Sequence, residues 1–522
     1  MKIQTVLEIL SLPRHGRSIG NFSGDGTLLL LGHCKTLQQL QAIHAQAITN
    51  GLVSLYPSLI LNKILFTLTL LNPFASTHYA TGVFNQIPNP STFSYNNIVR
   101  AYTLLSSPLF ALRMFARMRH LGVPPDSHTY PFALKACVRL RAHLIARVLH
   151  LQALKFGFGD DIFVRNSLIH VYSDGGSMAQ ACLLFYENTV RDVVTYNVLI
   201  DGFVKAGDTV QARRVLHEMP VRDCVSWSTV LAGYARMNQC NEAIQVFDEM
   251  IASGVPPDNV ALVSVLSACA KLGEVQRGED IHNYIKSEGI QLNVFLSTAL
   301  VDMYAKCGFV NVALDVFESS FRKNLSTWNA IIMGLAVHGH GELSLEYFWK
   351  MRRAGIRPDA ITFLGVLVGC SHGGLVEEAQ RLFNSMEDAY GVHRDLRHYG
   401  CMADLLSRAG LIDEVTKMIE KMPMQADVYV WGGLLGGCRI HGRVDVAEVA
   451  ARHLMELDPE DGGVYSIMIN MYATANRWED VVRMRRLMSE RKVERNTGCS
   501  SIPSGCMSHE LFSDKESINF GP

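Results

Sequence analysis

The sequence lacks an excess of charge of either sign. Its 522 residues include 48 Lys and Arg against 49 Asp and Glu, which gives a net charge of −1. A protein that holds nucleic acid only through phosphates needs many unbalanced basic groups, so the composition argues against a nonspecific nucleic-acid binder. With 48% hydrophobic and 19% charged residues, the chain is expected to fold. It is too long for one core, because a usual domain has roughly 150 residues.

Catalytic and metal-binding motifs are also missing. None of the twelve cysteines forms a CxxC pair, and no P-loop, GxSxG or HExxH motif occurs. The triplet from His340 to Glu342 is half of a zinc deaminase signature, but no PCxxC follows, so we interpret it as a chance match. The sequence therefore predicts a protein that is not an enzyme and uses no metal or cofactor. Four cysteines in similar helical phrases are predicted to be small buried residues: Cys34, Cys137, Cys269 and Cys370.

Long apolar runs are absent as well. The run 59–71 has 13 residues and contains Asn62 and Lys63, which is too short and too polar to span roughly 30 Å of hydrocarbon. Residues 1–23 carry three basic groups and one acidic group. This composition favours an organellar transit peptide over ordinary N-terminal sequence.

What the chain does contain is a repeated helical phrase. Between 193 and 223, apolar residues recur at helical spacing on both sides of Gly207, with Thr195 placed to cap the first helix and Pro220 to end the second. Opening phrases such as TYNVLIDGF and SWSTVLAGY, and closing phrases such as VPPD and IRPD, recur along the chain. Together they define consecutive units of 35, 35, 31, 31, 35, 35, 31, 35 and 36 residues: 92–126, 127–161, 162–192, 193–223, 224–258, 259–293, 294–324, 325–359 and 360–395.

Weaker units flank this series. Two units precede it, at 24–57 and 58–91, and one follows it, at 396–427. Two further helical pairs come next, at 428–461 and 462–496, and a short tail, 497–522, ends the chain. A lone helical pair cannot bury both of its apolar faces, so neighbouring pairs must stack on one another. The sequence thus predicts an all-α fold, a continuous α-solenoid of about fourteen helix-turn-helix repeats with a long groove.

The units resemble pentatricopeptide repeats in length and in their opening and closing phrases. Alternation of 35, 35 and 31 residues resembles the plant subclass that mixes three repeat variants (the PLS subclass). VWGGLLGGCRIHGRVDVAEVAARHL and the residues after it resemble the C-terminal extension (E-type) motifs of that subclass, up to Ser501, where a Trp is usual. The resemblance implies a right-handed superhelix, with the repeat array at 24–427, the extension at 428–496 and no deaminase domain.

The resemblance also implies that the fifth and last residues of a unit together read one RNA base. Both places are polar in six secure units, and the implied bases are uracil for Asn–Asp, guanine for Ser–Asp and adenine for Thr–Asn. The pairs are Asn96 with Asp126, Asn166 with Asp192, Asn197 with Asp223, Ser228 with Asp258, Thr298 with Asn324, and Asn329 with Asp359.

Other units complete the expected RNA pattern. Asn62 with Ser91 implies a pyrimidine, whereas Pro131, Val263 and Leu364 provide no polar reader. Gly400 likewise forms no readable pair. The expected single-stranded RNA is Y-U-n-U-U-G-n-A-U from 5′ to 3′.

The same residues have a structural explanation. Asn near a helix start often caps it, and Asp at a unit boundary often caps the next helix. The fifth position varies among Asn, Ser and Thr, however, where folding alone would be indifferent. This variation favours base reading.

These features imply an organellar RNA-binding protein, in the mitochondrion in preference to the chloroplast. The extension implies a site-recognition factor for C-to-U editing, with a deaminase-bearing partner recruited through residues beyond about 428. Two alternatives remain: a transcript stabilisation or splicing factor, and a protein–protein scaffold, which the near-neutral charge favours. A basic cluster near 483–492 either contacts phosphates or is a solvated helix face.

Overall fold

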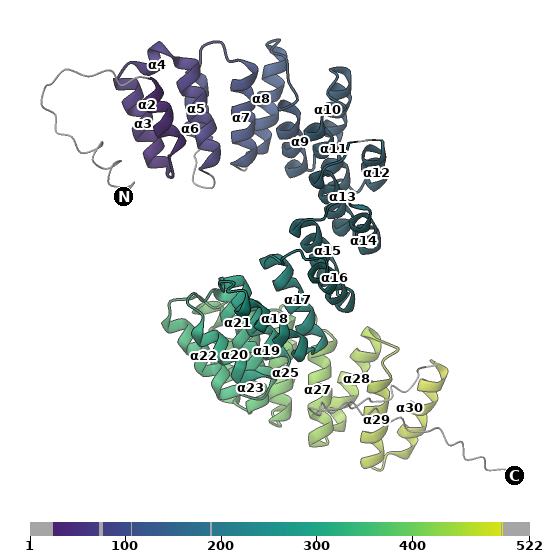
Figure 1. Ribbon diagram of the computed structural model, residues 1–522. Coiled ribbons are helices and arrows are strands. Elements are labelled where there is room, and N and C mark those ends of the chain that lie inside the picture. The colour runs from purple at the N-terminus through teal and green to yellow at the C-terminus, as the bar shows by residue number, and fades with distance from the viewer. Residues whose placement is uncertain (1–23, 72–76, 106, 188–189, 492, 494–522) are drawn as a thin grey trace, which may run out of the picture. The chain divides into compact units, whose positions relative to one another are not determined.

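The computed structural model describes residues 24–71, 77–105, 107–187, 190–491 and 493, and all regular structure in these ranges is helical (Figure 1). The helices fall into two compact units that meet in the sequence between Leu272 and Gly273. The all-α prediction is therefore confirmed. The predicted transit segment, 1–23, and the tail, 497–522, lie outside the described residues.

The first unit begins with three weakly repetitive helices and continues as regular pairs. Its helices are α2 (Gly24–Gly32), α3 (Leu37–Thr49), α4 (Leu52–Leu55), α5 (Pro57–Leu70), α6 (Thr77–Asn85), α7 (Thr92–Leu104), α8 (Pro108–His120), α9 (Thr129–Leu140), α10 (His143–Lys155), α11 (Ile162–Asp174), α12 (Met178–Tyr186), α13 (Val193–Ala206), α14 (Thr209–Glu218), α15 (Cys224–Arg236), α16 (Cys240–Ala252) and α17 (Asn259–Leu272).

The second unit continues the pattern to the extension. Its helices are α18 (Val275–Ser287), α19 (Val294–Lys306), α20 (Val310–Ser319), α21 (Leu325–Val337), α22 (Gly341–Arg353), α23 (Ala360–Gly373), α24 (Val376–Asp388), α25 (Leu396–Arg408), α26 (Ile412–Glu420), α27 (Val428–His441), α28 (Val444–Leu457), α29 (Gly462–Thr474) and α30 (Trp478–Glu490). Most first helices begin at the first residue of a predicted unit.

The hairpin of α13 and α14 shows how the sequence produces a unit. Asp192 caps α13 by accepting the Thr195 N–H at 2.8 Å, and Asp208 caps α14 by accepting the Gln211 N–H at 3.0 Å. Gly207 ends α13 with a φ of 81°, a left-handed conformation that costs glycine little. The prediction that Thr195 caps α13 was wrong, because the Asp192 carboxylate lies earlier and starts the helix at Val193.

Within each unit, first helices pack side by side and second helices pack against them. In the first unit α11, α13, α15 and α17 contact one another in succession, and α14 packs against both α13 and α15. Buried side chains such as Leu199, Ile200 and Leu216 fill the space between these layers. Each contributes roughly 1.5–3 kcal/mol by leaving water, so neighbouring repeats stabilise one another.

The cysteine prediction is correct at three of four positions. Cys137, Cys269 and Cys370 are buried, and burial raises the pKa of the Cys137 and Cys370 thiols to about 12. Cys34 is only half-buried, because it lies in the turn between α2 and α3 rather than inside a helix. Among the described ranges, no helix combines the length and apolar character needed to cross a bilayer.

Candidate nucleic-acid interface

Five of the six predicted residue pairs are in direct contact. In each, the fifth residue of a first helix donates a hydrogen bond to Oδ1 of the aspartate that ends the same repeat. The donor–acceptor distances are 2.8 Å for Asn96–Asp126, 3.4 Å for Asn166–Asp192, 3.3 Å for Asn197–Asp223, 2.7 Å for Ser228–Asp258 and 3.0 Å for Asn329–Asp359. The predicted pairing thus places two polar side chains together at one end of successive first helices.

The sixth pair is connected through a third residue. The Thr298 hydroxyl lies 2.7 Å from the Thr327 hydroxyl, and Thr327 Oγ1 donates to Asn324 Oδ1 at 2.9 Å. Thr298 Oγ1 is also 2.7 Å from the Val294 carbonyl oxygen, four residues earlier. The shorter threonine side chain therefore meets the hydroxyl beneath Asn324 and not Asn324 itself.

In most repeats the last residue also caps the following helix. Asp223 Oδ1 accepts the Ser226 N–H at 2.8 Å, and Asp359 Oδ1 accepts the Thr362 N–H at 2.9 Å. The structural explanation of these aspartates is therefore correct as far as capping goes. Capping occupies Oδ1, however, and within the described residues neither Asp223 Oδ2 nor Asp359 Oδ2 has a hydrogen-bond partner. One carboxylate oxygen remains available to a ligand.

These contacts keep the aspartates ionised. Burial by itself would raise the pKa of Asp126, but hydrogen bonds from Asn96 and Thr129 outweigh it, so the pKa lies below its usual value. Asp192 and Asp223 show the same balance, with burial opposed by hydrogen bonds from the capped residue and from the fifth residue. The interface therefore presents carboxylate acceptors at neutral pH.

A second series of side chains on the first helices was not predicted from the sequence. The second residue of most repeats is apolar yet exposed, by 48% for Ile361 up to 76% for Tyr429. The series comprises Leu59, Phe93, Phe163, Val194, Val225, Val260, Phe295, Ile361 and Tyr429. It lies three residues before the fifth position, hence on the same helix face. The signal in the sequence was an apolar residue in the first turn of most first helices, outside the buried stripe.

Comparison with known proteins identifies the repeats. PPR repeat models match residues 93–123, 188–220, 260–290, 296–325, 326–356, 361–390 and 397–425, a PPR repeat family model matches 222–271, and an E motif model matches 441–503. A pentatricopeptide repeat-containing protein of Arabidopsis thaliana is 52% identical over 93% of this chain and all of its own length. The chain belongs to the pentatricopeptide repeat family.

Other relatives agree with this assignment. A second Arabidopsis thaliana pentatricopeptide repeat-containing protein, named as chloroplastic, is 43% identical and covers 95% of this chain and 89% of its own. The crystal structure of the maize pentatricopeptide repeat protein PPR10 matches with a TM-score of 0.54 at 18% identity, over 94% of this chain and 88% of that one. This likeness supports the α-solenoid fold.

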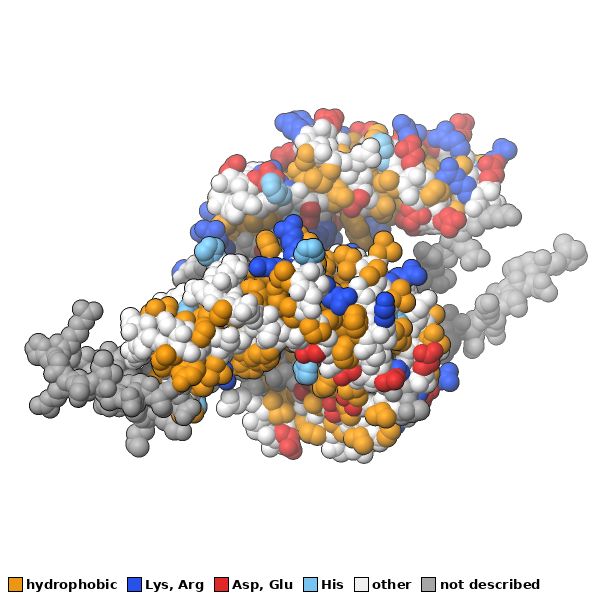
Figure 2. Space-filling model, turned by 90° about the horizontal axis from the view of Figure 1, so that it is seen from above, with side chains coloured by type: hydrophobic (Ala, Val, Ile, Leu, Met, Phe, Trp, Pro, Cys, Tyr) orange, Lys and Arg blue, Asp and Glu red, His pale blue; other side chains and the backbone are white. Residues whose placement is uncertain are grey.

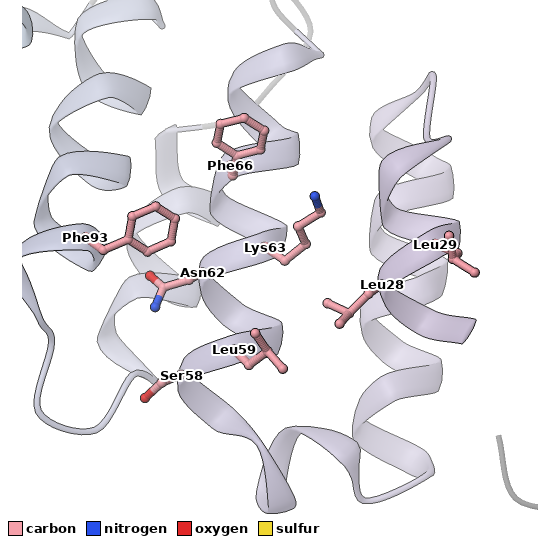
Figure 3. A pocket seen from close by; sticks show the side chains of 8 residues that line it. All are labelled: Leu28, Leu29, Ser58, Leu59, Asn62, Lys63, Phe66 and Phe93. Carbon is pink, nitrogen blue, oxygen red and sulfur yellow. The ribbon is translucent and has the colours of Figure 1, made fainter. Parts of the chain in front are cut away.

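The repeat at 58–91 shows one pentatricopeptide slot in detail. Leu59, Asn62 and Phe93 line a hollow of about 950 Å³ between first helices α2, α5 and α7 (Figure 3). In Figure 3 the Asn62 amide projects toward Phe93, while Leu28 points into the hollow from α2. Asn62 Oδ1 is buried without a hydrogen-bond partner. The repeat thus places a polar amide between two exposed apolar side chains, Leu59 and Phe93.

Not every pentatricopeptide repeat carries a polar reader. Pro131, Val263 and Leu364 occupy the fifth position in their repeats, and each is partly buried. These side chains offer no hydrogen bond to a base, as the sequence predicted. Gly400 offers no side chain at all.

Two of the arginines in the basic cluster near the C-terminal end of this pentatricopeptide chain form ion pairs. Arg483 pairs with Asp480 at 2.6 Å, and Arg486 pairs with Glu490 at 2.9 Å. Lys492 lies outside the described residues. The pairs favour a solvated helix face over a phosphate-binding surface. On the face shown in Figure 2, basic and acidic side chains are likewise interspersed.

The HxE triplet lies at the turn between α21 and α22. His340 precedes α22 and Glu342 lies in its first turn. Within the described ranges, no three His, Cys, Asp or Glu side chains are grouped as metal ligands would be.

Proposed function

We propose that this chain binds single-stranded RNA in a sequence-specific manner, one nucleotide to each repeat. The observation that carries the proposal is the recurrence of contacting fifth and last residues along successive first helices, from Asn96–Asp126 to Asn329–Asp359. Folding alone requires only the capping aspartate. The amide that contacts it adds a donor and an acceptor suited to a base edge.

Each slot combines the two interactions that hold an unpaired base. The exposed side chains at the second position, such as Phe93 and Phe295, offer apolar surfaces on which a base can stack. The fifth residue then meets the Watson–Crick edge of the stacked base. An asparagine amide complements the N3–H and carbonyl groups of uracil, and the free Oδ2 of the neighbouring aspartate adds an acceptor.

The near-zero net charge fits this mode of binding. A protein that relied on phosphates would lose affinity steeply with salt and would tolerate any sequence. Here the stacking and base-edge contacts supply the selectivity, and balanced surface charge limits nonspecific attraction. The same charge balance underlies the scaffold alternative, which predicts binding to peptide and not to RNA.

The experiment is a binding titration with the purified full chain. The RNA Y-U-n-U-U-G-n-A-U, embedded in an unstructured oligonucleotide, is compared with a scrambled oligonucleotide of the same composition. We expect at least about tenfold tighter binding to the ordered pattern, since several mismatched slots each lose roughly 1 kcal/mol. Equal affinities for the two RNAs would contradict sequence-specific recognition.

We further propose that the bound RNA is an organellar transcript whose C-to-U editing site this chain selects. The E motif match at 441–503 supports this role, since it overlaps the predicted extension. The deaminase would come from a partner recruited through residues beyond about 428. Sequencing of organellar RNA from a knockout plant tests the proposal. Loss of editing at one site supports it, whereas intact editing with altered transcript ends or retained introns favours stabilisation or splicing.

Two experiments identify the organelle: the sequencing of organellar RNA, and the localisation of the protein after import. The sequence favours the mitochondrion, whereas two of the relatives, 43% and 37% identical, are named as chloroplastic. Expression of the full chain fused to a fluorescent protein distinguishes the two compartments directly.

A further inference from the structure

A third residue lies beneath every reading pair. It is the third residue of the following repeat, and it is completely buried in all six cases, so it cannot touch RNA itself. These residues are Thr129, Thr195, Ser226, Ala261, Thr327 and Thr362. Five of the six carry a hydroxyl, although an apolar side chain is the usual occupant of so buried a place. Their hydroxyls contact the residues that read the base.

In the two 35-residue repeats with an Asn–Asp pair, this hydroxyl is close to the reading amide. Thr129 Oγ1 lies 2.7 Å from Asn96 Oδ1 and 2.9 Å from Asp126 Oδ1. Thr362 Oγ1 lies 2.6 Å from Asn329 Oδ1 and 2.9 Å from Asp359 Oδ1. The amide is held at both ends, with its nitrogen on the aspartate and its oxygen on the hydroxyl.

In the two 31-residue repeats with an Asn–Asp pair, the hydroxyl contacts only the carboxylate. Thr195 Oγ1 donates to Asp192 Oδ1 at 2.7 Å, and Ser226 Oγ donates to Asp223 Oδ1 at 2.6 Å. The amide oxygens of Asn166 and Asn197 are buried and have no hydrogen-bond partner. Their amide nitrogens are also farther from the aspartate, at 3.4 and 3.3 Å.

A hydroxyl has one hydrogen, so it can serve only one acceptor well. In the long repeats its oxygen already accepts the backbone N–H of Asp126 at 3.0 Å or of Asp359 at 3.1 Å. The hydrogen is thereby directed toward the reading pair. An amide turned by 180° would lose this bond, so the hydroxyl selects the orientation of the amide.

We propose that Thr129 and Thr362 are positioning residues, which fix the orientation of the reading amides of Asn96 and Asn329. The amides of Asn166 and Asn197 have no such hydroxyl, and their buried oxygens are left without a hydrogen-bond partner. In these four repeats, the hydroxyl holds the reading amide in the two of 35 residues and not in the two of 31 residues. This inference rests on the proposed RNA recognition and adds a buried third residue to the two that face the base.

The test compares two isosteric variants within the first unit. Thr129→Val acts on the second nucleotide of the expected pattern, and Thr195→Val acts on the fourth. Each variant loses one buried hydroxyl that contacts the aspartate of a reading pair, but only the Thr129 hydroxyl also contacts a reading amide. The readout is the ratio of affinities for uracil and cytosine at the nucleotide concerned, measured with the full chain. This ratio is insensitive to the fraction of folded protein.

We expect Thr129→Val to lower the uracil-to-cytosine ratio at the second nucleotide about fivefold, which corresponds to one hydrogen bond. Thr195→Val should leave the ratio at the fourth nucleotide unchanged. Thr129→Ser, which keeps the hydroxyl, should restore the wild-type ratio. The inference is overturned if both valine variants change their ratios alike, or if neither does. Should the wild-type chain show no base preference at all, the proposed function fails instead.

Discussion

The Asn96 amide donates a hydrogen bond to the Asp126 carboxylate at 2.8 Å across 30 residues of sequence. The same carboxylate oxygen accepts the Thr129 N–H at 3.0 Å. Recognition and folding therefore share one atom, because the aspartate that ends one repeat also accepts a backbone N–H from the first helix of the next. This connection explains why the closing Asp recurs in repeats of both lengths.

The Asn197–Asp223 pair provides the most direct test of the reading register. Asn197→Thr should shift the preference at the fifth nucleotide from uracil toward guanine. The Thr hydroxyl can take the place of the Ser228 hydroxyl, which donates to Asp258 Oδ1 at 2.7 Å and leaves Oδ2 to accept from guanine. Affinities for the four bases at that nucleotide measure the shift. Asn329→Thr is the matched control, since it should alter only the ninth nucleotide; an unchanged preference in both variants would refute the register.

The two roles of Asp223 can be separated by substitution. Asp223→Ala removes the acceptor for the Ser226 N–H and should lower stability by about 0.5–2 kcal/mol. Asp223→Asn keeps a capping oxygen and should remain within a few tenths of a kcal/mol of the wild type. Both variants lose the carboxylate, so both should weaken the preference for uracil at the fifth nucleotide.

Thermal midpoints and base-resolved affinities measure these two effects independently. Full retention of uracil preference by Asp223→Asn would mean that the aspartate acts only as a cap. In that case helix capping alone would explain why an aspartate stands at this position.

Acid should destabilise the array through its capping aspartates. Asp126, Asp192 and Asp223 have pKa values below the usual one, because hydrogen bonds outweigh burial. Groups with a lowered folded-state pKa stabilise the fold fully above the unfolded value of about 3.9, and this stabilisation is lost as the pH falls through the folded value.

The measurement is the urea midpoint between about pH 6 and about pH 3. The triple variant Asp126→Asn, Asp192→Asn, Asp223→Asn should lose less stability on acidification than the wild type. Asp174→Asn, at an exposed aspartate that caps no helix, is the control and should follow the wild-type curve. Parallel curves for the triple variant and the wild type would exclude these aspartates as the acid-sensitive groups.

The sequence predicted the repeats well because their signals are local. Glycine at Gly207, proline at Pro220 and the apolar spacing between them specify a hairpin without knowledge of its neighbours. The hydroxyl network was not predictable, because Asn96 and Thr129 are 33 residues apart and meet only when adjacent repeats stack. The cap of α13 was misplaced to Thr195 because Thr and Asp are both good caps three residues apart.

The exposed second residues were missed for a different reason. An apolar residue at a helix start is usually part of the core, and Phe295 gives no sign in the sequence that it is 71% exposed. Only the backbone direction of the first turn shows which face it occupies. Phe295 lies three residues before Thr298, so the two side chains share one face of α19 and can contact the same base.

Phe295 should contribute to RNA affinity and little to stability. Phe295→Ala removes the surface on which a base stacks and should weaken binding of the expected RNA about tenfold, since stacking on an aromatic ring contributes roughly 1–3 kcal/mol per base. Phe317→Ala is the contrasting variant, because Phe317 is buried against Trp328 and Tyr347 and its loss should cost about 3–5 kcal/mol of stability. Thermal midpoints and RNA titrations on both variants give the two effects. If Phe295→Ala lowered the midpoint as much as Phe317→Ala while leaving affinity unchanged, the exposed second residues would be structural, and the bases would have to be held by the polar pairs alone.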